Sequence, residues 1–169
     1  MDESLEALIQ RLRALEDIAA IKELKAAYWQ CIDRQQPALL RELLAADVAL
    51  DMEGVPCGER EAYSAIVERA GCRPGLFNLH AGQNSRIRLT GADTAEGHWD
   101  ALFTSIDVGE RLTIQMSCDY RDRYRRIDGR WWIAAMTVRQ TSFLMQRIDG
   151  EGKATVLSMG QNNAAAFDR

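Results

Sequence analysis

The chain has 169 residues, of which 47% are hydrophobic and 27% are charged, and its formal net charge is −4. This size and composition predict one soluble domain with a core of its own, and the acidic balance argues against a nucleic-acid partner, which would need a basic face. No apolar run approaches the roughly 18 residues that cross a bilayer, and the acidic start does not resemble a signal peptide, so we expect a cytoplasmic protein without a membrane partner.

The N-terminal part of the chain carries helical patterns. A 3-4-3 spacing, typical of an amphipathic helix, is formed by Leu5, Leu8, Leu12 and Leu15. Asp17 could cap a second helical stretch whose apolar face continues to Ile32. Pro37 ends this stretch, because proline disfavours helical geometry in the residue before it. The next segments expected are a short helix at 39–44, a strand at 48–53, a turn at 54–58 and a helix at 59–69.

From Phe77 onward the pattern changes to that of strands. The clearest alternation runs from Leu112 to Arg121, with apolar side chains at every second position. Asp128-Gly129 is a strong hairpin signal. Helices followed by antiparallel strands predict an α+β fold, in which a strongly curved sheet with helices on its concave side would enclose a pocket. We expect one domain over 1–148 and a tail over 149–169 that contributes to an oligomer contact.

His80 is the first candidate for chemistry, because it lies in an apolar stretch of small residues where a strand begins. A buried imidazole needs a hydrogen-bond partner, although a lone histidine of this kind also fits a structural role. Asp33 follows an apolar helix, where it fits either a solvated helix end or an inward-facing acceptor. If Asp33 accepted one ring N–H of His80, it would fix the tautomer and make the other nitrogen a better base.

Two further residues could complete such a site. Tyr28 lies five residues before Asp33, which turns an ideal helix by about 500°, so the two side chains converge only if they flank a cavity or the helix loosens. Arg139 is predicted to share a strand face with Ile133 and Phe143. A cation among such neighbours should be paired or functional, and it could bind a developing oxyanion; a strand-edge arginine facing water is the alternative.

Other sites have weak support. The sequence contains no P-loop, no GxSxG and no GxGxxG after a strand. His98 and Asp100 share a strand face and could chelate a metal, but such a pair more often lies exposed. Neither a redox pair nor a zinc knuckle is offered by the widely spaced Cys31, Cys57, Cys72 and Cys118. We therefore expect free thiols, no metal and no cofactor.

Several segments together are similar to SnoaL-like proteins of the nuclear transport factor 2 superfamily. They cover 15–25, 28–33, 79–82, 97–99, 124–133 and 138–139. Within that superfamily they look most like bile acid 7-alpha dehydratase, and more distantly like hexachlorocyclohexane dehydrochlorinase and scytalone dehydratase. The resemblance implies a conical α+β barrel with an interior pocket, and the relatives suggest a homo-oligomer, with a trimer favoured.

The resemblance also implies roles for individual residues. The aspartate–histidine base of the family matches Asp33 and His80, and the tyrosine and arginine of the bile acid enzyme match Tyr28 and Arg139. The dehydrochlorinases have a lysine where Tyr28 stands, so this chain leans toward the dehydratases. Where the bile acid enzyme has a further acidic residue, this chain has Phe103, so we expect the substrate or the handling of its leaving group to differ.

The sequence thus predicts a cofactor-free lyase, of the dehydratase or dehydrohalogenase type, acting on a hydrophobic small molecule. His80, oriented by Asp33, would remove a proton, while Tyr28 donates a hydrogen bond and Arg139 stabilises the developing charge. Candidates for the pocket wall, which would suit a polycyclic substrate, are Trp29, Phe77, Trp99, Phe103 and Met116. An isomerase or cyclase with the same base, and a ligand-binding protein without activity, remain open alternatives.

Overall fold

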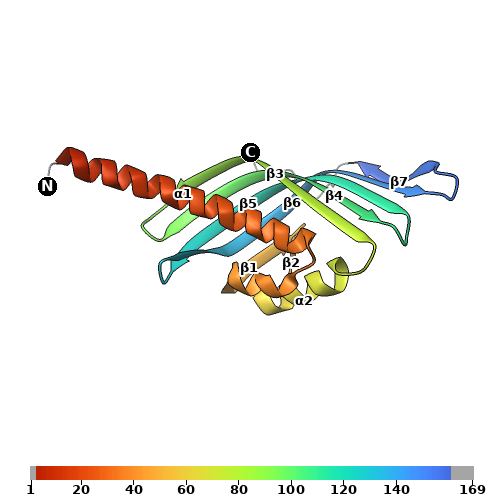
Figure 1. Ribbon diagram of the computed structural model, residues 1–169, viewed down its shortest axis with the longest axis horizontal. Helices are drawn as coiled ribbons and strands as arrows, with labels where there is room; N and C mark the ends of the chain where they lie inside the picture. The colour runs from red at the N-terminus through yellow and green to blue at the C-terminus, as the bar shows by residue number, and fades with distance from the viewer. Residues whose placement is uncertain (1–2, 161–169) are drawn as a thin grey trace.

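The computed structural model describes residues 3–160 as helices packed against one curved sheet (Figure 1). The elements follow in the order α1 (Glu3–Asp33), the 3-10 helix η1 (Pro37–Glu42), β1 (Leu44–Met52), β2 (Val55–Pro56), α2 (Arg60–Gly71), β3 (Leu76–Leu89), β4 (Thr94–Asp107), β5 (Leu112–Ile127), β6 (Arg130–Ile148) and β7 (Ala154–Gly160). The α+β class, with the helices largely before the strands, is confirmed. Among the described residues, no helix combines the length and apolar character needed to span a membrane.

The sheet has the strand order β2-β1-β6-β5-β4-β3, and β7 pairs with β6 outside this path. Paired strands are antiparallel, with the exception of β1 and β6, which run parallel. Because β2 and β3 lie at opposite ends of the path, the sheet curves without closing into a complete barrel. We call the face on which α1 packs the inner face and the opposite side the outer face.

α1 is one continuous helix of 31 residues, not the two stretches that the sequence suggests. Asp17 does not cap a second stretch. Its carboxylate instead accepts hydrogen bonds from Trp131 Nε1 at 2.9 Å and Arg126 at 2.5 Å, which fixes the middle of the helix to the β5–β6 hairpin. From there to its end the helix buries an apolar face against the sheet that includes Ile21, Leu24, Tyr28, Trp29 and Cys31.

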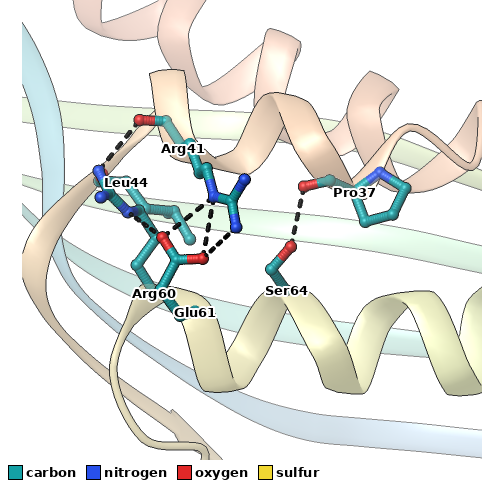
Figure 2. A network of polar contacts seen from close by, with 6 residues as sticks. All are labelled: Pro37, Arg41, Leu44, Arg60, Glu61 and Ser64. Carbon is teal, nitrogen blue, oxygen red and sulfur yellow. Dashed lines mark hydrogen bonds and ion pairs between the residues drawn. The ribbon is translucent and has the colours of Figure 1, made fainter.

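α2 is held beside η1 by polar contacts that Figure 2 shows. Arg41 of η1 donates to the carboxylate of Glu61 at 2.6 Å, and Ser64 donates to the carbonyl of Pro37 at 3.1 Å. The ion pair is exposed on both sides, so it contributes little to stability. Burial of Tyr63 and Val67 on the opposite side of α2 stabilises its position more than the ion pair does.

A β-bulge in β6 decides which of its side chains face inward. Tyr124 of β5 is opposite Ile133, but the preceding Arg123 is opposite Ala135, so β6 has one extra residue between these pairs. One extra residue exchanges the two faces of a strand. From this bulge to a second one between Gln140 and Ser142, the inward positions of β6 are therefore even-numbered, as the burial of Met136 and Val138 shows.

The tail contains more structure than its sequence suggests. β7 pairs with the end of β6, from Ile148 opposite Ala154 to Phe143 opposite Gly160. Residues 161–169 lie outside the described part of the chain. The domain boundary at 148 and a role of the tail in an oligomer contact stay predictions.

Candidate active site

A cavity of about 530 Å³ lies between the inner face of the sheet and the helices α1 and α2. Its wall is largely apolar and includes Ile32, Val67, Phe103, Ile114, Met116 and Val138. Polar side chains also reach the same wall, among them His80, Tyr28, Tyr63 and Tyr120 and the charged Glu53 and Arg73. An apolar chamber with a few converging polar groups is the usual form of a small-molecule site.

His80 and Asp33 meet at this cavity. Nδ1 of His80 lies 2.6 Å from Oδ1 of Asp33, and the backbone N–H of His80 donates to Oδ2 of the same carboxylate at 2.9 Å. Both oxygens of Asp33 are thus bound by residue 80, which fixes the orientation of the carboxylate. The short contact assigns the ring proton to Nδ1, because the carboxylate can only accept, and leaves Nε2 as the free, basic nitrogen.

Aromatic rings hold the imidazole of His80 from two sides. The ring of Trp29 stacks on it with 14° between the planes and 6.4 Å between the centroids, and the ring of Phe103 lies 4.6 Å away, tilted. Gly82 makes room for this arrangement, because a Cβ at that position would lie 2.0 Å from the ring of Trp29. The imidazole is therefore restricted in rotation as well as in tautomer.

Three tyrosines place hydroxyl groups around the cavity. The hydroxyls of Tyr28 and Tyr63 are 2.6 Å apart and hydrogen-bonded, and Tyr120 lines the same wall. Burial raises the pKa of Tyr28 well above its usual value and that of Tyr63 to about 12. At neutral pH these groups are therefore hydrogen-bond donors, not bases. Tyr63 has no part in the sequence-based site, although its position four residues before Val67 in a helical pattern marks it as inward-facing.

A buried ion pair lies beside the rings of Tyr28, Trp29 and Tyr120. The ammonium of Lys25 lies 2.8 Å from Oδ2 of Asp122, and neither side chain is exposed to solvent. The same ammonium lies 4.2 Å from the centroid of Tyr120 and 5.0 Å from those of Tyr28 and Trp29, within the range of cation–π attraction. Burial lowers the pKa of Lys25, and the Asp122 carboxylate opposes that shift.

Arg139 is not brought into the site. Its guanidinium pairs with Asp51 on the outer face, while its neighbours Val138 and Gln140 line the cavity. The expectation that Arg139 shares a face with Ile133 is wrong, because the bulge before Ala135 reverses the faces of the strand.

The predicted wall residues have different positions. Phe103 and Met116 line the cavity. Trp29 and Trp99 are buried behind it with their rings edge to face at 5.5 Å, so they support the wall without forming it. Phe77 does not reach the cavity, because it is three residues before His80 on one strand and is exposed on the outer face.

Cys118 lines the cavity, but burial raises the pKa of its thiol to about 11, so it is not a thiolate nucleophile at neutral pH. All four cysteines are free thiols, as expected.

The outer face carries a hollow of its own, of about 810 Å³, with a different character. Charged side chains dominate it, including Asp51, Arg86, Arg121 and His98. Near it, one nitrogen of His98 and one oxygen each of Asp100 and Asp119 lie within 4.8 Å of one another, which is a geometry that could hold a metal ion. These carboxylates already have partners, because Asn84 donates to Asp100 at 2.7 Å and Arg121 lies 3.5 Å from Asp119.

Comparison with known proteins places the chain among proteins of one fold. The family described as SnoaL-like domain matches residues 13–137. A candidate scytalone dehydratase from Novosphingobium aromaticivorans is 21% identical, with a TM-score of 0.70 over 77% of this chain and 87% of that chain. A hexachlorocyclohexane dehydrochlorinase from Novosphingobium barchaimii is 23% identical, with a TM-score of 0.69 over 88% and 94%.

A third solved structure is an NTF2-like protein with a cystatin-like fold from Novosphingobium aromaticivorans. It is 25% identical to this chain, with a TM-score of 0.67 over 82% of this chain and 90% of that chain. The three structures share the helix-and-curved-sheet architecture described above.

Proposed function

Because this chain belongs to the SnoaL-like domain family, whose match covers residues 13–137, we propose that it is a cofactor-independent lyase. It would eliminate water or a hydrogen halide from a hydrophobic small molecule. The observation that carries this proposal is the Asp33–His80 pair at the wall of a largely apolar cavity. Two of the similar structures bear the names of a dehydratase and a dehydrochlorinase, and both names denote eliminations.

The base in this mechanism is Nε2 of His80. It takes a proton from a substrate carbon, the C–H electron pair forms the new double bond, and the leaving group departs with the electrons of its own bond. Asp33, held 2.6 Å from Nδ1, stabilises the imidazolium that forms. General base catalysis of this kind is worth about 10²- to 10⁴-fold.

Tyr28 is the donor in this mechanism. Its hydroxyl stays protonated at neutral pH, since burial raises its pKa, and it can donate to the leaving oxygen or to a neighbouring carbonyl. Tyr63, at 2.6 Å, can in turn donate to Tyr28 as the latter turns toward the substrate. A departing hydroxide that accepts the proton from the imidazolium leaves as water, and His80 returns to its neutral form. Arg139 has no role here, because it pairs with Asp51 on the other face.

The cavity limits the class of substrate. A volume of about 530 Å³ with a mostly apolar wall suits a steroid, a terpenoid or an aromatic compound with one reacting polar group. A small polar substrate would leave most of this surface without a partner, so we expect poor activity on such compounds.

The test compares the two histidines of the chain. The purified protein is incubated with hydroxylated steroids, terpenoid alcohols and halogenated cyclohexanes, and mass spectrometry detects the loss of water or hydrogen halide. In His80→Asn the amide can still donate to Asp33 but carries no base, so elimination should be lost with the fold intact by circular dichroism. The matched control His98→Asn, on the outer face, should keep its activity.

The outcomes distinguish this function from its alternatives. A well-folded His80→Asn variant that eliminates at the wild-type rate contradicts the mechanism. A product of unchanged mass points to an isomerase or cyclase that uses the same base. Tight binding of an apolar compound without any product points to a binding protein.

A further inference from the structure

The N-terminal part of α1 carries an apolar surface that the fold does not use. In Figure 1 this end of the helix extends beyond the sheet. We define the leucine stripe as the four residues spaced 3-4-3 along it, which are Leu5, Leu8, Leu12 and Leu15. These four residues are between 47% and 65% exposed.

The leucine stripe points away from its own domain. Leu5, Leu8 and Leu12 each precede a buried residue of the same helix, namely Ile21, Leu24 and Tyr28, by sixteen positions. Sixteen residues turn an ideal helix by about 160° beyond whole turns. The stripe therefore lies nearly opposite the face that packs on the sheet, so the straight helix cannot lay both faces on the sheet at once.

The N-terminal part of α1 is already helical before it contacts another helix. A free helix of about two heptads is barely stable in water, but here the exposed segment is continuous with a half that the sheet already holds. Asp17, two residues after the stripe, is bound by Arg126 and Trp131 of the sheet. Pairing would therefore not have to bear the cost of forming the helix.

The charges beside the leucine stripe favour a second copy of the same helix. With Leu5 and Leu12 at heptad position a and Leu8 and Leu15 at d, Arg11 takes position g and Glu16 takes position e. In a parallel pair, g of one helix lies beside e of the other five residues further on. Arg11 then meets Glu16 of the second copy, and symmetry gives this contact twice.

The opposite arrangement lacks this match. An antiparallel pair with the four leucines in register brings position g beside position g, so the two copies of Arg11 would lie next to each other. Arg11 and Glu16 are exposed in the single chain. We propose that the leucine stripe binds the leucine stripe of a second copy of this chain, with the two helices parallel. This contact is separate from the active site and from the outer face of the sheet.

Sedimentation velocity over a range of concentrations tests the contact in the full chain. The double variant Leu8→Glu/Leu12→Glu should lower the mass of the assembly. The control variant Leu39→Glu, which changes an exposed leucine outside the stripe, should leave that mass unchanged. The substituted leucines are exposed, so the variants should keep their fold by circular dichroism. A mass equal to that of wild type at every concentration would overturn the proposal, as would a loss of assembly only in the outer-face variant Leu79→Glu/Leu102→Glu.

Charge reversal tests the direction of the helices. Arg11→Glu or Glu16→Arg alone should weaken self-association by about tenfold, because two attractive contacts become repulsive. The double variant Arg11→Glu/Glu16→Arg should restore it. A double variant as weak as the single ones would rule out the parallel arrangement, and so would Arg11→Glu that strengthens association by removing an arginine–arginine contact.

Discussion

The chain has two histidines, and each pairs with an aspartate, one on the inner face of the sheet and one on the outer face. The side chain of His80 is 10% exposed, and both carboxylate oxygens of Asp33 accept hydrogen bonds from residue 80, one from the ring and one from the backbone. The side chain of His98 is 33% exposed, and its partner Asp119 also lies 3.5 Å from Arg121. The same two residue types therefore have different surroundings on the two faces.

This difference shows what turns such a pair into a candidate base. On the outer face, His98 is partly exposed to water and Arg121 lies beside Asp119, so solvent and a neighbouring charge screen the pair. On the inner face the imidazole lies between Trp29 and Phe103 at the edge of an apolar cavity. Electrostatic interactions are stronger there, and His80 borders the cavity in which we propose that the substrate binds.

Removing the charge of the carboxylate should have the largest effect, and only on the inner face. In Asp33→Asn the amide would favour the wrong tautomer of His80, so the elimination rate should fall by about 10²- to 10⁴-fold. Asp119→Asn should stay close to the wild-type rate. Steady-state kinetics on the substrate found by the screen measures both, and equal losses in the two variants would remove the distinction between the faces.

Substitutions of a buried and an exposed lysine of α1 should differ in their effect on the free energy of unfolding. Lys25→Met leaves Asp122 buried without its cation, so the free energy of unfolding should fall by about 3–5 kcal/mol. Lys22→Met changes an exposed position of the same helix and should cost little. Urea denaturation measures both. If Lys25→Met lowers the free energy of unfolding no more than Lys22→Met does, the ion pair does not stabilise this part of the core.

Single substitutions can distinguish the roles of the two hydrogen-bonded tyrosines, Tyr28 and Tyr63. Tyr28→Phe removes the proposed donor and should lower kcat by about 10²-fold. Tyr63→Phe breaks the same hydrogen bond but keeps the hydroxyl of Tyr28, so its loss should be smaller. If Tyr63→Phe has the larger effect, Tyr63 is the group that touches the substrate.

A pH titration should give the smallest effect, without any substitution. Burial raises the pKa of all four tyrosines, that of Tyr63 to about 12. A folded pKa above the unfolded value of about 10 contributes stability that is complete below pH ~10 and is lost as the pH rises toward 12. Tyrosinate absorbance should therefore appear together with the loss of the circular dichroism signal. Absorbance that rises near pH 10 in the folded protein would contradict this burial.

The family and the central pair could be predicted from the sequence, because they depend on local signals. The SnoaL-like motifs predict the family that the comparison confirms. An aspartate that ends an apolar helix and a histidine among small apolar residues leave a contact open, and the resemblance to the family implies it. The structure has this contact at 2.6 Å. Phe103 and Met116 could be assigned to the wall from the alternation of their strands.

The remaining site residues depend on features that periodicity does not reveal. One extra residue after Ile133 reverses the faces of β6, and a second one between Gln140 and Ser142 reverses them again. The alternation that predicts Arg139 inside therefore holds at Ile133 and fails between the two bulges. The role of Lys25 could not be foreseen, because its partner Asp122 is 97 positions away in the sequence. The spacing of the leucine stripe predicts an amphipathic helix correctly, but a helical pattern does not say what covers its apolar face.

The bond from Asp33 to the backbone N–H of His80 joins the last residue of α1 to β3 across 47 positions of sequence. The proposed base thus exists only while the end of the helix rests on the sheet. During folding, a chain that has formed its hairpins but has not yet docked its first helix holds His80 in an unassigned tautomer and has no enclosed chamber. The activity proposed here would then be acquired in the same event that completes the tertiary structure.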